Sequence, residues 1–151
     1  KIAWLNRSEI SNNDIYKIIT YLTETQKQHI EDIVVLMPTH KSGYSAAEFI
    51  SKKKIKVNHI FEDRDAGNWN SRPRKLAFRT DETGLKMSTI NSYKGWESLT
   101  IVLVIPKNGS GFKGKENELI YTGMTRARSN LIVLNQNKKY WKFGESWQQM
   151  L

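Results

Sequence analysis

Residues 86–105 read KMSTINSYKGWESLTIVLVI, and this stretch decides the fold. It is predicted to contain two strands, residues 86–90 and residues 99–105, separated by a polar turn over residues 91–97. The second strand is apolar almost throughout, which is typical of a strand covered on both faces. Such strands belong to parallel sheets that carry helices on both sides.

Upstream of this stretch the pattern alternates between helical and extended. Ser11, followed by Asp14 three positions later, predicts a capped helix over residues 11–28. Residues 33–37 form a short apolar run that ends at Pro38, as expected of a buried strand. The helix that follows is predicted to begin at Ser45.

That second helix start rests on two local signals. Ser45 and Glu48 have the spacing of a capping box, and Tyr44 and Phe49 stand at the positions of a hydrophobic staple. Further strands are predicted over residues 57–61 and 131–134, and a further helix over residues 116–127. Because the strands alternate with helices, we predict an α/β fold with a mainly parallel sheet and helices on both faces.

Composition limits the classes of function. The chain has 151 residues, which suits one domain, and its formal net charge of +9 attracts polyanions such as nucleic acid or nucleotides. It has no cysteine, and its three histidines, His29, His40 and His59, lack ligand spacing, so we predict no metal site. No signal peptide or long apolar run is evident, which favours a cytoplasmic protein that does not enter membranes. Because the sequence begins at Lys1 without an initiator methionine, we expect a fragment of a longer chain.

The polar turn carries side chains suited to phosphate and ribose. We expect this turn at the carboxyl edge of the sheet, where open α/β sheets bind ligands. Gly95 can adopt a positive φ angle or let a ligand pass close, and Lys94 beside it supplies a positive charge, so both suit phosphate. Glu97 can accept hydrogen bonds from ribose hydroxyls.

Three short polar residues at the start of this stretch suit the backbone of a nucleic acid. Thr89, Asn91 and Ser92 offer donors of the kind that position a strand without reading its sequence. The alternative is a polar turn in which these residues cap the local backbone and Lys94 and Glu97 are solvated.

A second polar cluster, YTGMTRA, occupies residues 121–127 at the end of the predicted helix. On a helical wheel Arg126 falls just outside the apolar arc, so its stem can lie on the core while its guanidinium reaches over the rim of the sheet. Arg128 falls on the opposite flank, so the two arginines should not share one ligand. Arg126 can present a fixed charge to a phosphoryl group, or it can be a surface arginine paired with a carboxylate.

Together the two clusters resemble motifs V and VI of UvrD/Rep-like superfamily 1 helicases. Motif V, T-x-H-S-x-K-G-x-E, is matched with an asparagine in place of the histidine by Thr89, Asn91, Ser92, Lys94, Gly95 and Glu97. Motif VI, Y-V-x-x-T-R-A, is matched with a threonine in place of the valine by Tyr121, Thr122, Thr125, Arg126 and Ala127.

This resemblance implies a RecA-like second motor domain, over residues 1–151, of an ATP-dependent DNA helicase. It implies that Glu97 contacts the ATP ribose, that Arg126 contacts the γ-phosphate as the catalytic residue, and that Thr89 with Asn91 contacts single-stranded DNA. The first motor domain of the same chain would be the partner and would hold the Mg²⁺ that accompanies ATP. The fragment alone should not turn over ATP, and no obligate oligomer is implied.

Residues 33–61 are similar, more weakly, to the motif IV region of the same helicases. The stretch from Thr39 to Tyr44 is expected to be a loop, and it offers only His40 and Lys41 where the family often supplies a second γ-phosphate arginine. Few residues separate this region from motif V. The large helical insertion of UvrD must therefore be absent or very reduced.

Two other functions remain open from the sequence. Residues 109–115 read GSGFKGK and fit the P-loop spacing, so Lys115 could belong to an autonomous P-loop NTPase, although Glu116 stands where that motif needs a hydroxyl for Mg²⁺. The chain could also be a non-catalytic single-strand-binding module. The basic residues Arg72, Arg74, Lys75 and Arg79, near Trp69 and Phe78, suit backbone tracking and base stacking on single-stranded nucleic acid, and a loop held on its own domain by Trp69 is the alternative.

Overall fold

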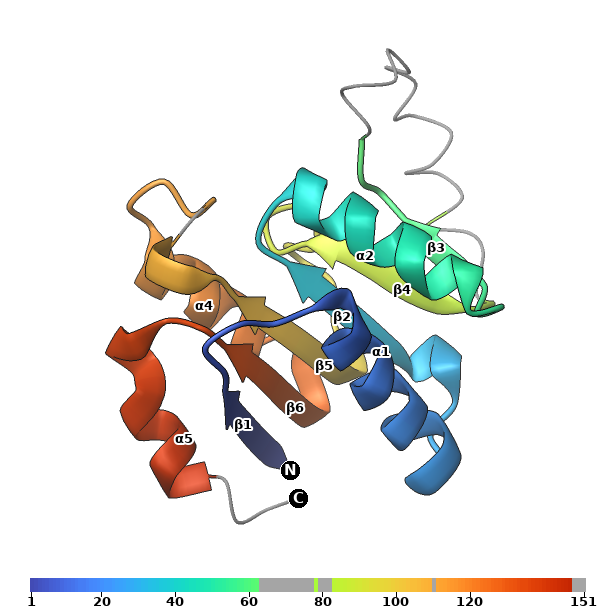
Figure 1. Ribbon diagram of the computed structural model, residues 1–151, viewed down its shortest axis with the longest axis horizontal. Helices are drawn as coiled ribbons and strands as arrows, with labels where there is room; N and C mark the ends of the chain where they lie inside the picture. The colour runs from blue at the N-terminus through green and yellow to red at the C-terminus, as the bar shows by residue number, and fades with distance from the viewer. Residues whose placement is uncertain (63–77, 79–82, 110, 148–151) are drawn as a thin grey trace.

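The fold is a single parallel sheet between two layers of helices (Figure 1). The computed structural model describes residues 1–62, 78, 83–109 and 111–147. The predicted strand-tracking residues Trp69, Arg72, Arg74, Lys75 and Arg79 therefore lie outside the described residues. The predicted α/β class, with helices on both faces of a parallel sheet, is confirmed.

The described sheet has six strands in the order β1-β6-β5-β2-β4-β3, and all neighbouring strands are parallel. Their bounds are β1 (Ile2–Asn6), β2 (Ile33–Met37), β3 (Val57–His59), β4 (Leu85–Thr89), β5 (Ser98–Ile105) and β6 (Ala127–Asn135). The longer helices are α1 (Asn12–Thr20), α2 (His40–Lys52), α4 (Glu116–Met124) and α5 (Trp141–Trp147). A π-helical segment (Tyr21–Thr25) extends α1, and short 3₁₀ turns cover Ile30–Asp32, Lys107–Gly109 and Lys138–Tyr140.

Two apolar cores follow from the period-two alternation of strand side chains. In β2, Val35 belongs to the core under α1 and α2, whereas Val34 and Leu36 belong to the core under α4. Helix α1 contributes Ile15 and Ile19 to the first core, and α2 contributes Ala46, Ala47 and Ile50. Every side chain of β2 is buried, and this burial on both faces explains why the sequence of the strand is apolar throughout.

The start of α1 agrees with the sequence prediction. The Asp14 backbone N–H donates to Ser11 Oγ over 3.2 Å, and the Ser11 backbone N–H donates to Asp14 Oδ2 over 2.8 Å. This is a complete capping box. The regular helix ends at Thr20, and the π-helical segment carries the chain on to Thr25.

The predicted start of the second helix is wrong. Helix α2 begins at His40, and its cap is Thr39, whose Oγ1 accepts a hydrogen bond from the Ser42 backbone N–H over 3.1 Å. Ser45 lies inside the helix, where its Oγ accepts a hydrogen bond from Asn12 Nδ2 over 3.0 Å. The predicted loop between Thr39 and Tyr44 is therefore the first turn of α2. A threonine directly after Pro38 satisfies the helix N-terminus before the Ser45 signal is reached.

The structure differs from the sequence prediction at two further places. The sequence patterns gave no indication of β1, which pairs with β6 at the end of the sheet. The predicted helix over residues 116–127 runs too far, because α4 ends at Met124 and Ala127 already pairs with Ser98 of β5. Strand pairing thus overrides helix propensity at the end of the second polar cluster, and β6 starts four residues before the predicted strand.

Candidate functional site

A short crossover over residues 90–97 connects two opposite edges of the sheet. It begins after Thr89, the last residue of β4, and ends before Ser98, the first residue of β5. Both strands pair in parallel with β2, so the crossover runs from the carboxyl edge back to the amino edge. The predicted position at the carboxyl edge is therefore wrong for Glu97, which directly precedes β5, and Arg126 likewise directly precedes β6.

At the carboxyl edge, Thr89 organises a tight turn. Its hydroxyl donates to Ser92 Oγ over 3.1 Å and accepts from the Ser92 backbone N–H over 3.3 Å. Thr89 is buried, whereas Asn91 and Ser92 are exposed. Of the three predicted nucleic-acid contacts, Thr89 thus supports the turn and the other two face solvent.

Within the crossover, Tyr93 is the buried anchor, with 4% of its surface exposed. Its backbone N–H donates to the Thr89 carbonyl over 3.1 Å, and its Oη donates to the Glu97 carbonyl over 3.2 Å. Burial raises the pKa of Tyr93 to about 12, so the phenol stays protonated and remains a donor at neutral pH. Sequence reasoning missed this residue because it occupies an unspecified position of motif V.

The turn after Tyr93 depends on glycine. Gly95 has a φ angle of +84°, a conformation that side-chain-bearing residues rarely adopt. The Trp96 backbone N–H donates to the Tyr93 carbonyl over 3.2 Å and closes the turn. Lys94 is exposed, so its ammonium is accessible to solvent and to anions.

Arg126 lies in the turn between α4 and β6, with its guanidinium folded over the end of the helix. Its Nε donates to the Thr122 carbonyl over 3.1 Å, its Nη2 to Thr125 Oγ1 over 3.2 Å, and its Nη1 to the Trp96 carbonyl over 3.5 Å. No carboxylate of the described residues forms an ion pair with it. The charge of Arg126 is thus held in place by neutral oxygens and is left without a neutralising partner in this part of the chain.

The structure brings Glu97 and Arg126 together at the amino edge. The Ser98 backbone N–H donates to the Arg126 carbonyl over 3.0 Å, which places the residue after Glu97 beside the arginine. Both charges also act on the Tyr93 phenol: Arg126 lowers its pKa and Glu97 raises it, and each effect is smaller than that of burial. The end of the first cluster and the end of the second therefore lie next to each other at this edge.

A hollow of about 340 Å³ adjoins this site at the amino edge. Its lining includes carboxylates, a cation and aromatic side chains, among them Glu31, Asp32, Tyr93, Trp96, Glu97 and Arg128. Arg128 thus shares this hollow with Glu97. Arg126 does not line it, which agrees with the expectation that the two arginines face different surroundings.

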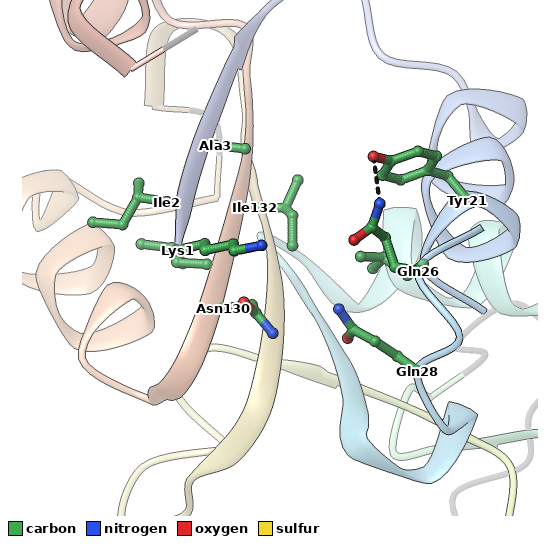
Figure 2. Close-up of a pocket in the computed structure, with 10 residues that line it drawn as sticks. Lys1, Ile2, Ala3, Tyr21, Gln26, Gln28, Asn130 and Ile132 are labelled. Atoms are coloured by element: carbon green, nitrogen blue, oxygen red, sulfur yellow. Dashed lines mark hydrogen bonds between the residues drawn. The ribbon is translucent and has the colours of Figure 1, made fainter. Parts of the chain in front are cut away.

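A second hollow, of about 140 Å³, lies between β1, β6 and the π-helical segment (Figure 2). Its polar lining includes Tyr21, Gln26, Gln28 and Asn130, and Gln26 Nε2 donates to Tyr21 Oη over 2.8 Å. None of the residues that the two motifs contribute lines this hollow. It is therefore separate from the Glu97 and Arg126 site.

Residues 111–115, within the described part of the predicted P-loop segment, include a buried side chain. Phe112 is buried in the core under α4, and a Cβ added to Gly111 would lie 2.3 Å from Thr39 Cγ2. The Lys115 backbone N–H donates to the Phe112 carbonyl over 2.9 Å, so this amide is engaged within the loop. Glu116 forms an ion pair with Lys139 at 3.8 Å.

Within residues 1–62, 78, 83–109 and 111–147, no three or more His, Asp or Glu side chains gather as metal ligands. No helix in the described part of the chain is long and apolar enough to cross a membrane.

Solved structures of helicase C-terminal domains share this fold. The C-terminal domain of a possible DNA helicase from Lactobacillus plantarum WCFS1 matches with a TM-score of 0.58 at 10% identity, over 89% of this chain and 71% of that chain. The C-terminal domain of S. cerevisiae Dbp5, solved with Gle1 and IP6, matches with a TM-score of 0.57 at 11% identity, over 99% of this chain and 84% of that chain. No protein-family model and no curated protein sequence matches. The chain has the fold of a RecA-like helicase C-terminal domain.

Proposed function

We propose that this chain is the second RecA-like motor domain of an ATP-dependent DNA helicase of the UvrD/Rep-like type, without the large helical insertion. The observation that carries the proposal is that Glu97 and Arg126 come at neighbouring positions on the amino edge of the sheet, each directly before the first residue of a strand. Two sequence clusters that resemble motifs V and VI meet there through the hydrogen bond between Ser98 and Arg126. The shared fold with helicase C-terminal domains supports the assignment.

ATP would bind between this domain and a first motor domain that carries the phosphate loop and holds Mg²⁺. Glu97 and Arg126 suit the two parts of the nucleotide that the first motor domain would leave uncontacted, the ribose and the γ-phosphate. Glu97 has the acceptor oxygens that a ribose hydroxyl needs, and Arg126 carries the positive charge that a γ-phosphate needs. Lys94 and Gly95, in the exposed turn of the crossover, would contribute to phosphate binding.

Arg126 is the residue to which we assign catalysis. Its guanidinium is supported by Thr122, Thr125 and Trp96, so little reorganisation is required when a phosphoryl group develops charge. An arginine in this role can accelerate phosphoryl transfer by ~10³ to 10⁵. Because the rest of the site belongs to the other domain, this domain alone should show no turnover.

Single-stranded DNA would lie at the opposite edge. Asn91 and Ser92 are exposed there, and Thr89 fixes the turn that presents them. The net charge of +9 supports a polyanionic partner. Closure of the two motor domains on ATP, followed by reopening after hydrolysis, would then move the protein along the strand.

A comparison of two substitutions in the intact protein tests the nucleotide assignment. Glu97→Ala should raise KM for ATP because a ribose contact is lost, whereas Arg126→Ala should lower kcat because a transition-state contact is lost. Glu118→Ala, which removes an exposed carboxylate from α4, is the matched control and should change neither. Equal behaviour of Glu97→Ala and Glu118→Ala would remove Glu97 from the site.

A further inference from the structure

We propose that Tyr93 is a positioning residue, whose hydroxyl holds Glu97 and Arg126 in place relative to the Thr89 turn. This inference rests on the proposed function, because it places Tyr93 between the proposed nucleotide site at the amino edge and the proposed DNA contact at the carboxyl edge. It adds a residue that neither motif specifies.

A continuous chain of hydrogen bonds passes through Tyr93. On one side its backbone N–H binds the Thr89 carbonyl at 3.1 Å. On the other side its carbonyl binds the Trp96 N–H at 3.2 Å, and the Trp96 carbonyl accepts from Arg126 Nη1 at 3.5 Å. The two edges of the sheet are therefore linked by direct hydrogen bonds over this short segment.

The side chain of Tyr93 reinforces the same link. Its ring is buried in the core under α4 and packs edge-on against Phe78, with ring centroids 6.4 Å apart. From this fixed position the hydroxyl donates to the Glu97 carbonyl over 3.2 Å. Because Glu97 itself is exposed, this hydrogen bond ties its backbone to the core.

Removal of the hydroxyl should therefore loosen Glu97 without emptying the core. Tyr93→Phe keeps the ring and its contact with Phe78, so the fold should be retained. The Glu97 backbone would then lose its tether, and the neighbouring Trp96 carbonyl that supports Arg126 would move with it. Small misplacements of a catalytic group have large effects on rate.

The test is the ATPase activity of the intact protein with and without single-stranded DNA. For Tyr93→Phe we expect kcat in the presence of DNA to fall about tenfold, with KM for ATP changed by less than about twofold. Tyr140→Phe is the matched control, because it also removes a buried tyrosine hydroxyl, one that donates to Asn117 Oδ1 over 2.6 Å. This control should lower the unfolding midpoint while leaving kcat unchanged.

A second measurement separates positioning from stability. If the hydroxyl acts through Arg126, its removal should have a smaller effect on kcat when Arg126→Lys is already present, since coupled residues are not additive. An unchanged kcat in Tyr93→Phe, or fully additive losses in the double variant, would overturn the positioning role. If the proposed function itself were wrong, Arg126→Ala would leave ATP turnover intact. That result would distinguish this case from a failure of the Tyr93 role alone.

Discussion

The backbone N–H of Ser98 donates a hydrogen bond to the carbonyl of Arg126 over 3.0 Å. This contact joins the amino ends of β5 and β6, and with them the ends of the two polar clusters. Since Glu97 immediately precedes Ser98, the register of these two strands sets the backbone positions of Glu97 and Arg126 relative to each other. The geometry of the proposed nucleotide site is therefore set by the most extensively paired strands of the sheet.

Tyr93 should ionise at a higher pH than a solvent-exposed tyrosine side chain. Burial raises its pKa from 10.0 to about 12 by penalising the charged form, so ionisation of this phenol lowers the stability of the folded protein by up to about 3 kcal/mol. No stability is lost below pH 10, and the loss develops as the pH rises from 10 through about 12. The spectrophotometric titration curve of the wild type, after subtraction of the curve of the Tyr93→Phe variant, should show one phenol that ionises with a midpoint near pH 12. A midpoint near pH 10 would contradict the burial of the hydroxyl.

The capping box of α1 should contribute to stability in a pH-dependent way. Ser11→Ala should lower the free energy of unfolding by about 1 kcal/mol at neutral pH. The Ser11 side chain and then its backbone N–H lower the pKa of Asp14 below 3.8, so this stabilisation is present above pH 3.8 and is lost as the pH falls through the folded pKa. Urea unfolding at several pH values measures the difference. Ser51→Ala, on the exposed face of α2, should have little effect at any pH.

Gly43 should not tolerate alanine, although alanine is the better helix former. An added Cβ would lie 2.2 Å from the ring of Phe61, so Gly43→Ala should cost about 1 to 3 kcal/mol in thermal or urea unfolding. Gly43→Ala should cost less in a Phe61→Leu background than in the wild type, because the smaller leucine leaves room for the added methyl group. A stabilised Gly43→Ala protein would mean that α2 does not approach Phe61 this closely.

Asn91 should contribute to single-strand binding without reading sequence. In the intact protein, Asn91→Ala should weaken DNA affinity about five- to tenfold for strands of different sequence, as expected from loss of one contact to the backbone. KM for ATP without DNA should not change. Asn13→Ala, at an exposed position of α1, is the control. An unchanged affinity would mean that single-stranded DNA binds elsewhere on the domain.

Local patterns predicted the central strands because those strands are buried on both faces. The apolar run over residues 33–37 coincides with β2, and the predicted strand over residues 99–105 differs from β5 by one residue. The Ser11 cap was also predicted, since both of its partners lie within three positions. These features depend on neighbours in sequence or on burial alone.

The remaining features depend on contacts between distant parts of the chain. The end of α4 is set by pairing of Ala127 with Ser98, and β1 is a strand through its pairing with β6. Helix α2 starts after Thr39 and not at the predicted Ser45, and close packing of Gly43 on Phe61 accompanies this earlier start. The division of the site between two edges already follows from the predicted parallel pairing, because Thr89 ends one strand and Glu97 precedes the next.

The most direct measurement of the central claim is ATP turnover by the intact protein carrying Arg126→Ala, compared with Arg128→Ala. We predict that Arg126→Ala lowers kcat by ~10³ or more while nucleotide binding is retained, and that Arg128→Ala retains turnover. Turnover by Arg126→Ala at the wild-type rate would contradict the assignment of this domain as one wall of an ATP site.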